Sequence, residues 1–246
     1  MTISTSPLSM GGLQGGVSRR SHGVRLGVAI AVSTFTALTM GAALWLNRPF
    51  QVEIASYRTS LADRTDAQRH NIHRAAMSLD GMVVEPGETF SFNQVVGPRT
   101  PERGYREAAA FMERDLVKSI GGGICQVSST VYNAAAFAAL DIVERHPHFR
   151  RVASVPPGRD ATVWYGMTDL RFRNGYPNPV RLAVTVANEA LIVAVSSRRP
   201  SDLAIALRTE PRKSQVGSLA FETVRTTTRV GKPGVQEVLS FDVYLN

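Results

Sequence analysis

Residues 121–130 read Gly-Gly-Gly-Ile-Cys-Gln-Val-Ser-Ser-Thr, and this stretch determines how the rest of the chain is interpreted. From Ile124 onward, apolar residues recur at helical spacing, which predicts a helix that begins directly after the three glycines. Glycine permits positive φ angles and lets backbone N–H groups approach a ligand closely. Cys125 would then lie in the first helical turn, where the helix dipole and unpaired N–H groups favour a thiolate and can hold an oxyanion.

Cys125 has two interpretations at this point. A loop–cysteine–helix arrangement is how papain-like and transglutaminase-like enzymes present their nucleophile. The alternative is a small buried cysteine that packs at a helix start, with the glycines forming a tight turn. Both interpretations predict the same local structure, so the decision depends on whether a base lies nearby.

Composition excludes several kinds of site. The net charge is +8, but residues 1–50 hold four arginines and no acidic residue, so the remainder has 24 basic and 20 acidic residues. Without a Lys/Arg tract, nucleic acid is not expected as a partner. Since Cys125 is the only cysteine, an intramolecular disulfide and a multi-cysteine metal site are excluded. The spacing of Cys125, His146 and His148 fits no common structural zinc motif, and nothing near His70 and His73 supplies a third ligand, so neither a metal nor another cofactor is expected.

The N-terminal region predicts a membrane anchor. Residues 1–25 are expected to be a polar tail. Residues 26–46 carry no charged side chain and are long enough to cross a bilayer as a helix. Arginines precede this segment, so the positive-inside rule places the tail in the cytoplasm and the rest outside the cell membrane. A cleaved signal peptide is the alternative. Residues 47–68 are expected to be an extended linker.

The pattern along the chain predicts an α+β fold, with N-terminal helices that include the cysteine-bearing one, followed by a mostly antiparallel sheet. Helices are expected at 63–79 and near 105–112. Residues 180–186 and 191–195 alternate around Asn188-Glu189, which predicts a hairpin. A papain- or transglutaminase-like core is the more specific expectation. The other strands are expected at 82–84, 89–92, 141–143, 152–155, 161–165, 170–173, 203–207, 222–229 and 236–244.

A nucleophilic cysteine requires a base and a group that orients the base. His146 and His148 follow the predicted cysteine helix on either side of Pro147, and either could accept the thiol proton. Asp160 comes after a turn and is the candidate to orient the histidine. Each residue also has an ordinary explanation, as a solvated loop or a turn, and only their combination with Cys125 favours catalysis.

A series of motifs resembles the VanW family, which is named from glycopeptide-resistance gene clusters. The resemblance runs from about residue 69 to 183, and we expect a VanW domain at 69–200 with a C-terminal β extension at 201–246. The motifs lie at 71–76, 79–93, 96–100, 104–108, 121–133, 144–148, 158–163 and 169–174.

The resemblance implies a function that involves the peptidoglycan of the cell wall. Some VanW-domain proteins are associated with L,D-transpeptidase activity, in which the glycine-flanked cysteine would be the nucleophile and peptidoglycan stem peptides the substrate. Cys125 would attack a peptide carbonyl, with the family-matching His148 as base and Asp160 as its orienter; the acceptor, water or a second stem peptide, is left open. The alternative is a non-catalytic wall-binding or scaffolding module linked to glycopeptide resistance. Candidate substrate-binding residues are Gly121, Gly122, Gly123, Gln126, Ser128, Ser129, Asn93 and Arg159.

Overall fold

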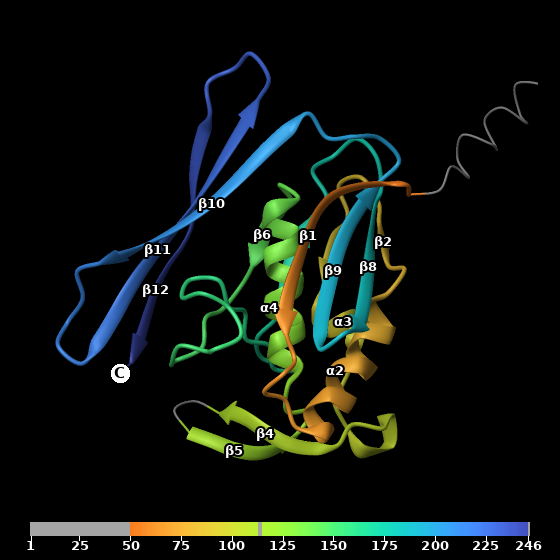
Figure 1. Ribbon diagram of the computed structural model, residues 1–246, viewed down its shortest axis with the longest axis vertical. Helices are drawn as coiled ribbons and strands as arrows, with labels where there is room; N and C mark the ends of the chain where they lie inside the picture. Colours follow the sequence, from red (N-terminus) through yellow and green to blue (C-terminus); the bar gives the residue numbers. More distant parts are fainter. Residues whose placement is uncertain (1–49, 113–114, 246) are drawn as a thin grey trace, which may run out of the picture. The chain divides into compact units, whose positions relative to one another are not determined.

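The computed structural model describes residues 50–112 and 115–245 (Figure 1). The predicted tail at 1–25 and the predicted anchor at 26–46 lie outside these residues. Among the helices of the described part, none is long and apolar enough to span a membrane.

Helix α4 (Ile124–Phe137) lies at the centre of the described residues and carries Cys125 in its first turn (Figure 1). Twelve of its 14 residues are buried, including its polar ones, since β1, β9, α2, β6 and β10 surround it. The sequence predicts a helix with one apolar face, whereas the structure encloses it on several sides. Its buried polar side chains must therefore find hydrogen-bond partners within the protein.

A four-stranded antiparallel sheet covers one side of α4, in the order β1-β9-β8-β2. The predicted hairpin is confirmed as β8 and β9, joined at Asn188 and Glu189, whose φ angles of 49° and 57° are those a tight hairpin turn requires. Residues 52–60, expected as part of a linker, instead form the edge strand β1, because alternate side chains pack against α4. The bounds are β1 (Val52–Ser60), β2 (Val83–Val84), β8 (Val180–Ala187) and β9 (Ala190–Ser197).

Helix α2 (Asp66–Leu79) packs against α4 and β8. Thr65 and Gln68 form a reciprocal capping box that satisfies the first backbone N–H groups of α2. A small sheet of order β3-β7-β6 lies nearby, with a stacked Phe90–Phe172 pair at a centroid distance of 4.5 Å. The remaining elements of this region are β3 (Thr89–Ser91), α3 (Phe92–Val96), a 3-10 turn (Pro101–Arg103), β6 (Asp141–Glu144) and β7 (Arg171–Arg173).

Three expectations of regular structure are wrong. The helix expected near 105–112 is the strand β4 (Glu107–Met112), which pairs with β5 (Asp115–Ile120) in an antiparallel hairpin. Alanine-rich sequence favours a helix locally, but strand pairing overrides that propensity here. Residues 152–155 and 161–165 form no strand; the second segment makes only isolated bridges, because its backbone bonds to side chains of α4 instead.

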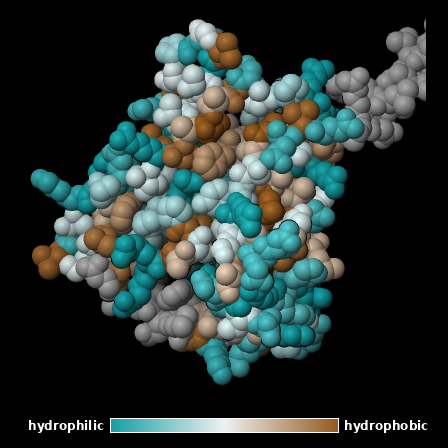
Figure 2. Space-filling model, in the orientation of Figure 1, coloured by the Kyte–Doolittle hydropathy of each residue, from teal (hydrophilic) through white to brown (hydrophobic). Residues whose placement is uncertain are grey.

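The C-terminal residues form a separate three-stranded antiparallel sheet, β10-β11-β12 (blue in Figure 1). Buried Arg225 of this sheet donates to the carbonyl of Leu140, at 2.8 Å, just beyond the end of α4. Figure 2 shows mainly hydrophilic residues on the visible face, with hydrophobic ones between them. The predominance of antiparallel sheet with few helices is compatible with the predicted α+β class. The bounds are β10 (Leu203–Arg212), β11 (Ser218–Arg229) and β12 (Val235–Leu245).

Two residues of α2 provide a matched test of this core. Leu79 is fully buried, whereas Met77 is 66% exposed on the same helix. Leu79→Ala should lower the free energy of unfolding by about 2–5 kcal/mol through lost burial and a residual cavity. Met77→Ala should change it by no more than about 0.5 kcal/mol. Urea unfolding measures both, and equal effects would contradict the packing described.

Candidate active site

Three glycines place Cys125, and each has a geometric reason to be glycine. Gly121 and Gly123 have φ angles of +87° and +101°, and Gly123 is the N-cap of α4. At Gly122, a Cβ atom would lie 2.5 Å from the carbonyl oxygen of Ala108. The loop can therefore turn sharply beneath β4 and begin the helix one residue before Cys125.

Cys125 is partly exposed in a cleft of about 800 Å³. Of the residues proposed from sequence to bind substrate, Gly121, Gly123 and Gln126 line this cleft, and His148 lines it as well. In the described part of the chain, the backbone N–H of Cys125 donates to no backbone carbonyl. That N–H group is therefore available as a donor, as a developing oxyanion would require.

Cys125, His148 and Asp160 form one continuous arrangement. The thiol of Cys125 lies 3.6 Å from the hydroxyl of Thr162 and 3.8 Å from the carbonyl oxygen of Val163. His148 lines the same cleft, and its interaction with the thiol lowers the pKa of Cys125. On the other side of the ring, Nδ1 of His148 lies 2.6 Å from a carboxylate oxygen of Asp160, which also accepts the His148 backbone N–H at 2.7 Å. Because Asp160 holds Nδ1, the nitrogen left for the thiol is Nε2.

The pKa values of this arrangement favour an ion pair. Burial alone would raise the pKa of Cys125, but the hydrogen bond and positive charge of His148 outweigh it and lower the pKa to about 7. For His148, burial alone would lower the pKa, but hydrogen bonds to Asp160 and Cys125 raise it to about 9. Between these values the thiolate and the imidazolium coexist, which is the state of an activated cysteine nucleophile.

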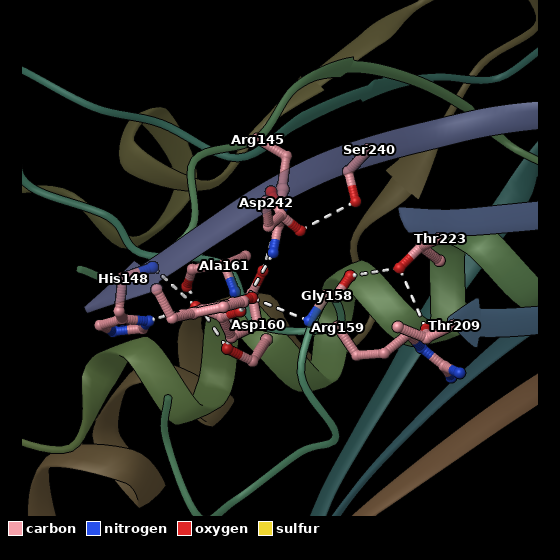
Figure 3. A network of polar contacts seen from close by, with 12 residues as sticks. Arg145, His148, Gly158, Arg159, Asp160, Ala161, Thr209, Thr223, Ser240 and Asp242 are labelled. Atoms are coloured by element: carbon pink, nitrogen blue, oxygen red, sulfur yellow. Dashed lines mark hydrogen bonds and ion pairs between the residues drawn. The ribbon is translucent and has the colours of Figure 1, made fainter. Parts of the chain in front are cut away.

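Asp160 is almost completely buried, and its charge is compensated by donors from distant parts of the chain (Figure 3). Tyr244 of β12 donates its hydroxyl to Asp160 at 2.5 Å, and Arg145 contacts the same carboxylate at 3.1 Å. Arg145 in turn pairs with Asp242 of β12. Burial would raise the pKa of Asp160, but the hydrogen bond from His148 and the charge of Arg145 hold it below its usual value.

The polar face of α4 fixes the segment that carries Asp160. Ser128 donates to the carbonyl of Ala161 at 2.6 Å, and Ser129 accepts the N–H of Ala161 at 2.9 Å. Asn133, one turn further along, donates to the carbonyl of Arg159 at 2.7 Å. The helix that presents the cysteine therefore also holds the segment at 159–161. Ser128 and Ser129 therefore hold the backbone next to Asp160 and do not line the cleft.

In the structure His148 lies at the same cleft as Cys125, whereas His146 does not. His146 is bonded to Glu144 and its side chain is 46% exposed. Arg159 lies outside the cleft, buried against the rings of Tyr57 and Phe137. The remaining candidates, Gly122 and Asn93, do not line the cleft either, and Asn93 instead fixes a neighbouring arginine.

Sequence reasoning assigned no role to Arg145, Asp242 or Tyr244. Residues 145 and 244 are separated by 99 positions, and no motif links them. Only the pairing of the C-terminal sheet brings β12 to Asp160. In the described part of the chain, no group of three His, Cys, Asp or Glu side chains is arranged to hold a metal ion.

The pH dependence of thiol alkylation tests the ion pair. The rate of Cys125 alkylation by iodoacetamide should rise with a midpoint near pH 7, because the thiolate is the reactive form. His148→Ala removes the stabilising charge, so the rate at pH 7 should fall roughly 10- to 50-fold. A midpoint at or above pH 9 in the unaltered protein would contradict the ion pair.

Replacing Tyr244 by Phe tests the support from the C-terminal sheet. The change removes a hydrogen bond to a buried carboxylate and leaves the N–H of Gly158, which donates to the same hydroxyl, without its acceptor. Unfolding free energy should fall by about 1.5–3 kcal/mol, and alkylation of Cys125 near pH 7 should slow. Tyr176→Phe, which loses a bond to the neutral carbonyl of Ala138, is the control and should cost about 1 kcal/mol with no effect on alkylation.

The family model described as VanW like protein matches residues 67–196. The uncharacterized protein YoaR of Bacillus subtilis is 44% identical over 145 residues, which cover 59% of this chain and 48% of YoaR. The vancomycin B-type resistance protein VanW of Enterococcus faecalis is 30% identical over 139 residues, which cover 54% of this chain and 50% of that protein.

The chain thus spans about half the length of the curated relatives it matches. No solved structure is a significant match. Cys125, His148 and Asp160 all lie within the residues matched by the family model, whereas β12, which supports Asp160, lies outside them. Since the model matches more than half of the sequence, the chain belongs to the VanW family.

Proposed function

We propose that this protein is a membrane-anchored, extracytoplasmic cysteine acyltransferase that acts on stem peptides of peptidoglycan, in the manner of an L,D-transpeptidase. The observation that carries the proposal is the arrangement of Cys125, His148 and Asp160 at a cleft large enough for a peptide. A cysteine that merely packs would need neither a lowered pKa nor an oriented imidazole. The helix-borne cysteine followed by histidine and aspartate is also the order expected for a transglutaminase-like core, although this likeness is an analogy of arrangement.

The proposed reaction begins with attack by the Cys125 thiolate on the carbonyl carbon of a peptide amide. A carbon–sulfur bond forms and the carbon–nitrogen bond breaks, while Nε2 of the His148 imidazolium gives its proton to the leaving amine. Asp160 holds the ring in the orientation that this transfer requires. The backbone N–H of Cys125 stabilises the oxyanion of the intermediate.

The second half of the reaction releases the thioester. An amine of a second stem peptide, or water, attacks the thioester carbon and gives its proton to the neutral His148. The carbon–sulfur bond then breaks, which regenerates the thiolate and the imidazolium and leaves a new amide or a free acid. The acyl acceptor decides whether the outcome is a cross-link or hydrolysis.

The proposed substrate and location rest on the surroundings of the site. Arg64, Arg99 and Arg151 line the cleft, where they favour an anionic ligand over a cationic one, and Trp164 and Tyr165 add partly exposed aromatic surface. The name of the enterococcal relative ties that protein to vancomycin resistance, which is consistent with a substrate in the cell wall. An anchor at 26–46 would hold the cleft on the outer side of the membrane.

Mass spectrometry of the full chain with disaccharide-tetrapeptide muropeptides tests the proposal. The unaltered protein should gain the mass of the donor minus its leaving residue, and Cys125→Ala should gain none. His148→Ala should slow adduct formation by about 100-fold or more, because it removes the general acid and base. His146→Ala is the matched control, since His146 is exposed and does not line the cleft, and it should change the rate by less than about threefold.

A different outcome would favour a non-catalytic wall-binding module. In that case the unaltered protein would remain unmodified, while it and Cys125→Ala would retain muropeptides equally well.

The pH dependence of the reaction separates the catalytic function from the binding function further. Acyl transfer should follow a bell with limbs near pH 7 and pH 9, where the thiolate forms and the imidazolium is lost.

A further inference from the structure

Arg99 lines the same cleft as Cys125, and its guanidinium is held in place from two sides. Nη1 donates to the side-chain oxygen of Asn93 at 2.7 Å, and the guanidinium carbon lies 5.5 Å from the centre of the Phe92 ring. Asn93 is itself anchored, since its amide donates to the carbonyl of Thr168 at 2.8 Å. Arg99 is therefore a positioned cation rather than a side chain free to sample solvent.

The glycine loop and Arg99 fit against each other. A Cβ atom at Gly121 would lie 2.9 Å from the Cβ and 3.1 Å from the Cγ of Arg99. Gly121 also has a positive φ, so its lack of a side chain serves both the turn and the close passage of Arg99. The stem of Arg99 consequently crosses the loop that leads directly into Cys125. Cation and nucleophile occupy neighbouring parts of one cleft.

One part of the guanidinium has no partner. Nη2 of Arg99 is buried and makes no hydrogen bond to any described residue. Burial is the main influence on Arg99 and lowers its pKa, with only partial compensation from Tyr105, Cys125 and the carboxylate of Asp169. Asp169 is already engaged by the N–H groups of Asn93 and Leu170.

A buried cationic donor without an acceptor is unfavourable in the unliganded protein, and a ligand that supplies the acceptor removes this penalty. The planar guanidinium matches a carboxylate, which can accept charge-assisted hydrogen bonds with both of its oxygens. Nη1 already donates to Asn93, so the buried Nη2 is the group of this guanidinium that a ligand carboxylate would have to reach. An anionic group of the ligand is therefore expected next to the reacting amide.

We infer that Arg99 binds the free terminal carboxylate of a peptide whose last amide bond lies at Cys125. This inference rests on the proposed function in taking that amide as the bond that is cleaved. The residue that carries the carboxylate is then the leaving group, so the site selects chain ends and acts on the amide bond that precedes the last residue. An internal amide, which is followed by another peptide bond, offers Arg99 no charge.

Equilibrium binding tests the inference separately from catalysis. The full chain carrying Cys125→Ala is titrated with a stem tetrapeptide ending in D-alanine, either as the free acid or as the C-terminal carboxamide. The acid should bind at least about tenfold more tightly than the carboxamide, as expected for a hydrogen bond between charged groups. Adding Arg99→Gln should bring this ratio close to one.

Two further variants serve as controls. Arg151 lines the same cleft but is exposed, and Arg151→Gln should preserve the preference for the acid, which excludes a general effect of cleft charge. Arg99→Lys keeps the charge without the planar fork and should retain a reduced preference. Unchanged affinity of the Arg99→Gln protein for the carboxamide would show that its cleft is still folded.

Equal affinity for acid and carboxamide, no detectable binding of either, or a preference that survives Arg99→Gln would each overturn the inference. The thioester assay on the unaltered protein reports separately on the proposed function. A carboxylate preference that depends on Arg99 without any thioester would leave the binding site standing and refute acyl transfer. If acid and carboxamide instead bind with equal affinity and form the thioester at equal rates, acyl transfer would be supported and the carboxylate site at Arg99 refuted.

Discussion

The site depends on the buried carboxylate of Asp160. A charge in the protein interior is tolerated only when donors surround it, and here they come from His148, Arg145 and Tyr244. This requirement joins three parts of the chain: the segment after β6, the loop at 156–161 and the last strand. His148 is oriented as a consequence, and through it the thiol of Cys125 is ionised near neutral pH. The C-terminal sheet, outside the residues that match the family model, is thus part of the site.

Helix α4 connects this charge network to the cleft. Its first turn presents Cys125, while Ser128, Ser129 and Asn133 satisfy the backbone of the segment around Asp160. Cys125 and the segment that carries Asp160 are therefore both fixed to one helix, which limits errors in their relative position. The same glycine loop that starts the helix leaves room for Arg99, so Cys125 and the proposed carboxylate site share one scaffold.

The local sequence pattern predicts some features of this structure correctly and others wrongly. The alternation of apolar residues around Asn188-Glu189 predicted the β8–β9 hairpin, and the spacing after Gly123 predicted the cysteine helix, because both depend on neighbours in sequence. The segment at 105–112 was predicted as a helix, since the pairing with β5 that makes it a strand is not visible in its composition. Tyr244 and Arg145 could not have been identified, because only long-range packing brings them to Asp160. The choice of His148 over His146 came from the family resemblance, and the geometry supplies its physical reason.

The reactivity expected of the site depends on a thiolate–imidazolium pair that Cys125 and His148 form inside a folded cleft. The most direct measurement is the nitrogen NMR spectrum of the His148 ring at pH 8, assigned by comparison with His148→Gln. We predict that both ring nitrogens carry protons at this pH, since the pKa of His148 is raised to about 9, and that Cys125→Ala lowers that pKa. A neutral imidazole at pH 8 in the unaltered protein, with one nitrogen unprotonated, would contradict the account.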